Sequence, residues 1–89
     1  MKLFKRFSAK LSTKEQRMEA SGLLYDIAEL TNLKEAVYYE KELLPYSKKY
    51  GYDKYLKLLR EVKRRIETGF RERNEPKAIV ASAINKILT

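Results

Sequence analysis

The chain has 89 residues, of which 44% are apolar and 36% are charged, and it contains neither cysteine nor histidine. These absences exclude disulfides, thiolate metal sites and catalysis by cysteine or histidine, and the length allows only one hydrophobic core. Twenty lysines and arginines against twelve aspartates and glutamates give a net charge of +8, which favours polyanionic partners such as nucleic acid or an anionic membrane surface, with solubility alone as the alternative.

The order of the segments predicts one domain with a basic extension. We expect residues 1–11 to form a basic amphipathic segment and residues 12–89 to form a single helical domain. No apolar run approaches the ~18–20 residues that a membrane span needs, and the start MKLFKRF lacks the apolar core of a secretory signal. We therefore expect an intracellular, cytoplasmic protein.

The N-terminal segment combines aromatic and basic residues at helical spacing. Phe4, Phe7 and Leu11 recur three and four residues apart, with lysines and arginines between them. Such a segment packs on the domain, lies on an anionic membrane surface or contacts nucleic acid. Lys5 and Arg6 are its candidate nucleic-acid-binding residues.

The first helix of the domain is predicted to begin at a capping box. Ser12 and Glu15 have the spacing at which a hydroxyl and a carboxylate each bind a free backbone N–H at a helix start. From Ala20 to Leu30 the apolar residues fall three and four apart, which indicates one buried stripe. Gly22 lies inside this pattern and predicts either a close approach of helices or a break.

The second helix is predicted to begin at Asn32, because Glu35 follows it at the cap-plus-acid spacing. Its sequence is NLKEAVYYEKELL. Pro45 has no backbone N–H and predicts a break or a sharp kink, after which PYSKKY forms a short helical turn. Gly51 is the expected stop.

The third helix, DKYLKLLREVKRRIETGFRER, is the longest amphipathic pattern in the chain. Asp53 is placed to cap it, and we expect it to continue through Gly69 to Arg73. Its apolar stripe consists of Tyr55, Leu59, Val62, Ile66 and Phe70.

A row of basic residues occupies the other side of this helix and is the candidate nucleic-acid-binding face. At 100° per residue the row contains Lys57, Arg60, Arg64 and Arg71. Lys48 and Lys49 lie just before the helix and extend the candidate site. Basic side chains pair with phosphates, and Tyr46, Tyr50 and Tyr52 are placed to stack on bases.

The last helix begins with Pro76 in its first turn and is almost uncharged. We expect it either to lie centrally in the bundle or to pair with its copy in a homodimer. No strand pattern competes anywhere. The sequence therefore predicts an all-α bundle of four to five short helices.

One stretch, DIAELTNLKEAVYYEKEL at 26–43, resembles a helix-turn-helix DNA-binding motif. Ala28 and Leu30 match its first helix, Asn32 its turn glycine and Leu33 its apolar turn residue. The stretch departs from the pattern where Tyr38 occupies the position of the buried β-branched residue. The resemblance implies that Lys34, Tyr38 and Lys41 face DNA.

No catalytic or cofactor site is predicted. The glutamates mostly lie beside lysine or arginine at helical spacing, and no glycine-rich phosphate loop is present. We expect no enzyme activity, no cofactor and no metal. The primary hypothesis is a nucleic-acid-binding protein for DNA or RNA, and the alternative is a non-enzymatic interaction module that self-associates or binds an acidic protein.

Overall fold

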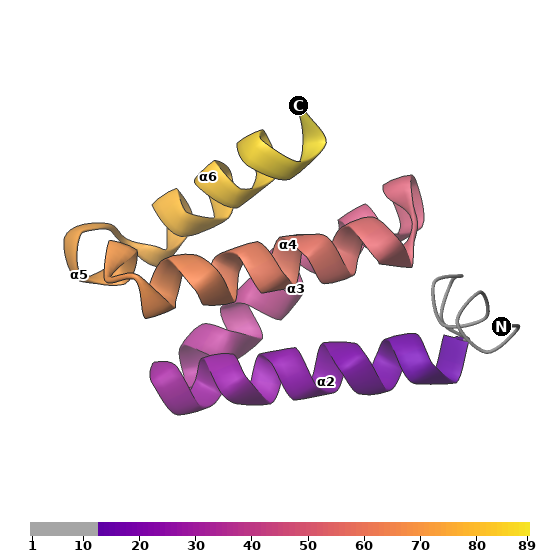
Figure 1. Ribbon diagram of the computed structural model, residues 1–89, viewed down its shortest axis with the longest axis horizontal. Coiled ribbons are helices and arrows are strands. Elements are labelled where there is room, and N and C mark those ends of the chain that lie inside the picture. The colour runs from indigo at the N-terminus through magenta and orange to yellow at the C-terminus, as the bar shows by residue number, and fades with distance from the viewer. Residues whose placement is uncertain (1–12) are drawn as a thin grey trace, which may run out of the picture.

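The computed structural model describes residues 13–89, and the expectations for residues 1–12, including Ser12, Lys5, Arg6 and membrane attachment through the N-terminal segment, lie outside this range. The described chain is an all-α bundle, as predicted (Figure 1). Its helices are α2 (Thr13–Leu30), α3 (Leu33–Tyr50), α4 (Tyr52–Glu67), α5 (Phe70–Arg73) and α6 (Pro76–Leu88).

The long helices alternate in direction. In Figure 1, α2 and α4 run side by side in the same direction, while α3 and α6 run back the opposite way. The short helix α5 turns the chain between α4 and α6 at one end of the bundle. The beginnings of α2 and α4 and the end of α3 therefore lie together at the other end.

The helix α4 is the centre of the bundle, because it contacts each of the other four described helices. The four members of the predicted apolar stripe that lie in α4 are buried, and Leu56 and Leu58 beside the stripe are buried as well, since neighbours cover the helix from two sides. The fifth member, Phe70, lies in α5 and is partly buried. The expectation that the last helix lies centrally is therefore wrong: α6 lies on one side of α4. No helix within residues 13–89 is long and apolar enough to cross a membrane.

The start of α3 has the predicted cap. The Asn32 side-chain oxygen accepts a hydrogen bond from the backbone N–H of Glu35 at 2.8 Å. This satisfies one of the N–H groups that a helix start leaves without a helical partner. The turn between α2 and α3 consequently needs only Thr31 and Asn32.

Pro45 does not end the second helix, contrary to the prediction, and α3 continues through it to Tyr50. The proline side chain is exposed, so water can solvate the carbonyl that loses its partner. Leu43 is buried on the other side of the helix, and Tyr46 packs against the core. Packing on both sides of the proline holds the helix together.

Gly51 is the predicted stop of α3, and it is also the residue from which α4 starts. Its φ of 94° is unfavourable for any residue with a Cβ, and its N–H donates to the Ser47 carbonyl at 3.0 Å. The prediction that Asp53 caps the third helix is wrong, because α4 already begins at Tyr52. The Asp53 carboxylate instead accepts a hydrogen bond from Gln16 of α2 at 3.2 Å.

The third helix also ends earlier than predicted. It stops at Glu67, and Gly69 adopts a left-handed conformation with φ of 86° before the short helix α5 begins at Phe70. This turn lets the Phe70 ring pack against the core and under the Arg65 guanidinium, 5.1 Å from its carbon to the ring centre. The residues after Gly69, including Arg71, therefore do not lie on the faces that one continuous helix would give them.

Gly22 lies in the uninterrupted helix α2, and a Cβ added there meets no atom within 4 Å. Neither a break nor a close helix approach explains it. We expect Gly22→Ala to raise the free energy of unfolding by about 1 kcal/mol, because alanine loses less backbone entropy in a helix. Urea unfolding checks this, and Gly51→Ala, which forces a side chain into a positive φ, should lower stability in the same assay.

Candidate nucleic-acid interface

One residue of the predicted basic row, Arg60, and its neighbour Lys63 form ion pairs with acidic residues of α2. The Arg60 guanidinium lies 3.1 Å from the Glu19 carboxylate, and the Lys63 ammonium lies 3.1 Å from that of Asp26. The hydrogen bond from Lys63 to Asp26 raises the pKa of the lysine. These two pairs hold the parallel helices α2 and α4 in register, and they offset part of the charge that was expected to meet phosphates.

Arg64 belongs to a second group of charges, around the carboxylate of Glu61. This carboxylate is buried, with only 6% of the residue exposed, and lies 2.6 Å from Arg64, 2.8 Å from Arg65 and 3.6 Å from Lys86 of α6. The hydrogen bond from Arg64 lowers the pKa of Glu61 against the opposing effect of burial, and the three positive charges lower it further. The charges on this side of α4 thus help to attach α6.

The lowered pKa of Glu61 predicts a pH-dependent contribution to stability. Because the folded-state pKa is below the ordinary value near 4.5, the contribution is complete above that pH and is lost as the pH falls through the folded-state pKa. Glu61→Gln should therefore be less stable than the parent protein at neutral pH, and the difference should shrink on acidification. Urea unfolding over a pH series checks this; a difference that stays constant down to the acid limit contradicts it.

Arg71 is withdrawn from the row by the turn at Gly69. It lies in α5, where its guanidinium contacts the Glu35 carboxylate of α3 at 2.9 to 3.0 Å. Glu35 is only 8% exposed and also accepts a hydrogen bond from the fully buried Tyr39 hydroxyl. Burial first, and then this hydrogen bond, raise the pKa of Tyr39. Arg71 therefore fastens α5 to α3.

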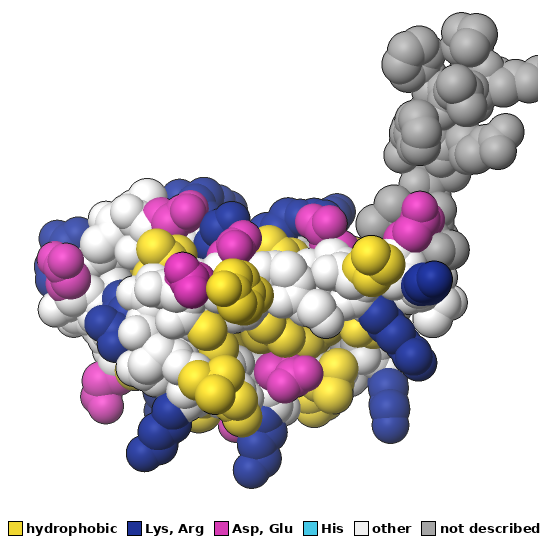
Figure 2. All heavy atoms as spheres, turned by 90° about the horizontal axis from the view of Figure 1, so that it is seen from below, with side chains coloured by type: hydrophobic (Ala, Val, Ile, Leu, Met, Phe, Trp, Pro, Cys, Tyr) yellow, Lys and Arg dark blue, Asp and Glu magenta, His cyan; other side chains and the backbone are white. Residues whose placement is uncertain are grey.

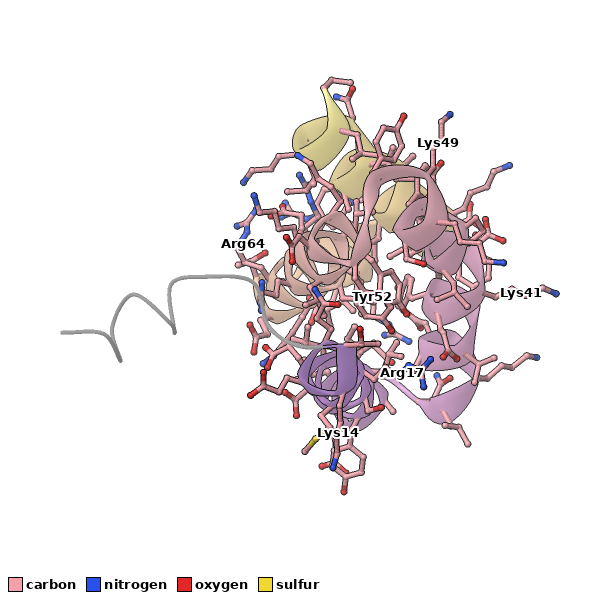
Figure 3. The ribbon with its side chains drawn as sticks, turned by 90° about the vertical axis from the view of Figure 1, so that its right-hand side faces the viewer. Lys14, Arg17, Lys41, Lys49, Tyr52 and Arg64 are labelled. Atoms are coloured by element: carbon pink, nitrogen blue, oxygen red, sulfur yellow. The ribbon has the colours of Figure 1, made fainter. Side chains whose placement is uncertain are left out.

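Ten basic residues form no ion pair with any residue in 13–89, and six of them gather where α2 and α4 begin and α3 ends. Figure 3 looks onto this end: Lys14 lies at one edge, Arg17 near the middle and Lys49 at the opposite edge. We call this surface the basic end, and it consists of Lys14, Arg17, Lys48, Lys49, Lys54 and Lys57.

Tyrosines accompany these charges. Tyr50 is 46% exposed, its ring lies parallel to that of Tyr46 at 6.1 Å, and the Lys49 ammonium lies 5.4 Å from its centre. Tyr52 lies at the same end of the bundle (Figure 3), and its half-buried ring contacts the ring of Tyr55. The basic end thus combines cations that have no acidic partner with an exposed aromatic ring.

The structure brings together only part of the site predicted from the sequence. Lys48, Lys49 and Lys57 share the basic end, whereas Arg64 extends from a separate flank (Figure 3). The site predicted from the sequence did not include Lys14 and Arg17, and Lys54 was placed only at the flank of the basic row. The direction of the helices could have predicted that Lys14 and Arg17 join Lys48 and Lys49. Consecutive antiparallel helices place the start of α2 beside the end of α3.

The stretch that resembles a helix-turn-helix motif has exposed apolar residues at its turn. Leu33, which matches the apolar turn residue of the motif, is 73% exposed, and the neighbouring Val37 is 50% exposed. Lys34 and Lys41 are exposed on α3, and Tyr38 is half-buried. The packing therefore gives the resemblance no support beyond the capped turn itself.

No group of three or more acidic side chains within residues 13–89 is arranged to hold a metal ion.

Comparison of the chain with known protein families, with characterised proteins and with solved structures finds no significant match.

Proposed function

We propose that the protein binds single-stranded nucleic acid, DNA or RNA, through the basic end and without sequence specificity. The observation that carries the proposal is the gathering of six cations without ion-pair partners at one end of the bundle. Residues 1–12 carry four more basic residues and join the described chain at Thr13, at the same end.

The contrast with the arginines of α4 that form ion pairs supports this choice of surface. A phosphate approaching Arg60 or Arg64 competes with carboxylates already 2.6 to 3.1 Å away. A phosphate approaching Lys49 or Lys57 displaces only water and counterions. Each contact at the basic end thus contributes fully to counterion release, which drives non-specific binding.

The aromatic ring favours a single strand over a duplex. Stacking on an exposed tyrosine requires an unpaired base, and such stacking contributes about 1–3 kcal/mol per base whatever the sequence. Tyr50 is 46% exposed, and Lys49, whose ammonium lies over its ring, can hold the adjoining phosphate. A duplex offers phosphates but no free base face.

The test is a titration of labelled single strands of about 12 nucleotides, DNA and RNA, and of a duplex of equal length over a salt series. We expect similar affinity for unrelated sequences, weaker binding of the duplex, and log K falling against log salt with a slope up to about −4 for six cations on a single strand. Absence of binding at about 50 mM salt, or binding insensitive to salt, refutes the proposal.

A further inference from the structure

A row of three lysines extends from the basic end along the exposed side of α3. Lys48 belongs to the basic end, and Lys41 and Lys34 follow it at intervals of seven residues, which is about 10.5 Å along the helix axis. All three are exposed and form no ion pair within residues 13–89. In Figure 3 Lys41 projects from α3 away from the other helices. We call these three lysines the α3 row.

Apolar side chains separate the lysines of the row. On a helix surface the neighbours of a residue lie three and four positions away, and for Lys41 these are Val37, Tyr38, Leu44 and Pro45. The same four residues are the neighbours of the two outer lysines within α3. Val37 is 50% exposed and Leu44 is 42% exposed. Along the lower border of Figure 2, where α3 lies, basic side chains accordingly project at intervals with hydrophobic side chains exposed beside them.

A cavity of about 320 Å³ lies between two lysines of the row. It is lined by Lys41, Leu44, Pro45 and Lys48. Its apolar walls can contact the flat face of an unpaired base, and a cation on each side can hold the phosphates that adjoin this base. The alternation of cations and apolar side chains thus matches the two components of a single strand.

The glutamates of α3 restrict the shape of an anionic ligand. Glu40 and Glu42 are exposed and form no ion pair within residues 13–89. Consecutive residues of a helix lie about 100° apart around its axis, so these carboxylates point to opposite sides of Lys41. Glu40 is also the surface neighbour of Val37 and Leu44. A flat anionic membrane that takes up these apolar side chains has to accept Glu40, whereas a strand can follow the row between the two carboxylates.

We propose that a single strand of nucleic acid bound at the basic end continues along α3 over Lys41 to Lys34. This inference rests on the proposed function and adds two cations to its binding surface. The row ends at Lys34, because Glu75 at the start of α6 shares a cavity with this lysine. Lys34, Tyr38 and Lys41 are also the residues that the resemblance to a helix-turn-helix motif directs toward DNA. In this arrangement they contact an unpaired strand and not the groove of a duplex.

The test compares two variants on strands of two lengths. One variant combines Lys34→Gln with Lys41→Gln and removes the two cations that the row adds. The control combines Arg73→Gln with Lys77→Gln, which removes two exposed cations without ion pairs in the described chain, in and next to the turn between α5 and α6. The net charge falls from +8 to +6 in both variants.

We expect the row variant to bind a strand of about 12 nucleotides about 25-fold more weakly than the unchanged protein at about 0.1 M salt. Its slope of log K against log salt on this strand should be less steep by about 1.4. A strand of about 4 nucleotides should bind with unchanged affinity, because the six cations of the basic end hold it. The control should match the unchanged protein at both lengths. Circular dichroism should show both variants folded, since Lys34 lies in the first turn of α3, where a positive charge is unfavourable.

Three results overturn the inference: equal losses in the two variants, equal losses at the two lengths, and a long strand that binds the row variant as tightly as the unchanged protein. Sedimentation with phosphatidylserine vesicles that requires Lys34 and Lys41, while strand binding does not, assigns the row to a membrane surface. Strands that bind the protein without using the row leave the proposed function intact. If neither strand binds the unchanged protein, the proposed function fails and this inference fails with it.

Discussion

Replacing Lys49 and Lys57 together by glutamine is expected to weaken binding to single-stranded nucleic acid about 25-fold at about 0.1 M salt. Each cation that neutralises a phosphate on a single strand releases about 0.7 of a counterion, which at this salt corresponds to about fivefold in affinity. Both lysines belong to the basic end, are exposed and form no ion pair within residues 13–89. Their removal therefore leaves no carboxylate without a partner.

The matched control replaces Arg73 and Lys77 by glutamine. These residues are also exposed and without ion pairs in the described chain, but they lie around α5 and the start of α6, at the opposite end of the bundle. The net charge of both variants falls from +8 to +6. Long-range attraction is thus equal in the two proteins, and only a binding surface at the basic end separates their affinities.

The salt dependence adds a second readout. The slope of log K against log salt should become less steep by about 1.4 in the variant at the basic end and should be unchanged in the control. Equal losses in both variants would mean that the overall charge of the protein, and no particular surface, drives association. A larger loss in the control would place the binding surface at the opposite end.

Local signals predicted most helix boundaries correctly. Asn32 caps α3, Gly51 ends it and Pro76 begins α6, because each boundary depends on the backbone geometry of one or two residues. The same kind of signal failed at Pro45, whereas at Gly69 the continuing apolar periodicity gave the wrong prediction. At Pro45 tertiary packing of α3 outweighs the cost of a proline, and at Gly69 the packing of the partly buried Phe70 against the core favours a turn that helical periodicity alone does not require.

The candidate site was harder to predict, because ion pairing between distant residues decides which cations are available. Arg60 pairs with a residue 41 positions away, and Arg71 with one 36 positions away. Periodicity places residues on a face of their own helix, but it does not reveal which acidic residues a neighbouring helix brings to that face. The partners of Arg60 and Arg71 depend on how α2 lies relative to α4 and how α5 lies relative to α3.

Replacing Glu35 by alanine is expected to lower the free energy of unfolding by about 2–3 kcal/mol. The Tyr39 hydroxyl is buried and loses its acceptor, and a buried polar group without a hydrogen bond costs about 1–3 kcal/mol. The contact that fastens α5 through Arg71 is lost as well. For a chain of this size such a change lowers Tm by roughly 4–8 °C per kcal/mol, which thermal unfolding followed by circular dichroism measures directly.

Glu42 in the same helix provides the comparison, since it is exposed and forms no ion pair within residues 13–89. Glu42→Ala should change stability by no more than about 0.5 kcal/mol. Tyr39→Phe adds a specific check: in the Glu35→Ala background it removes the hydroxyl that no longer has an acceptor, so it should restore part of the lost stability. If Glu35→Ala is as mild as Glu42→Ala, the buried carboxylate does not hold α3 and α5 together.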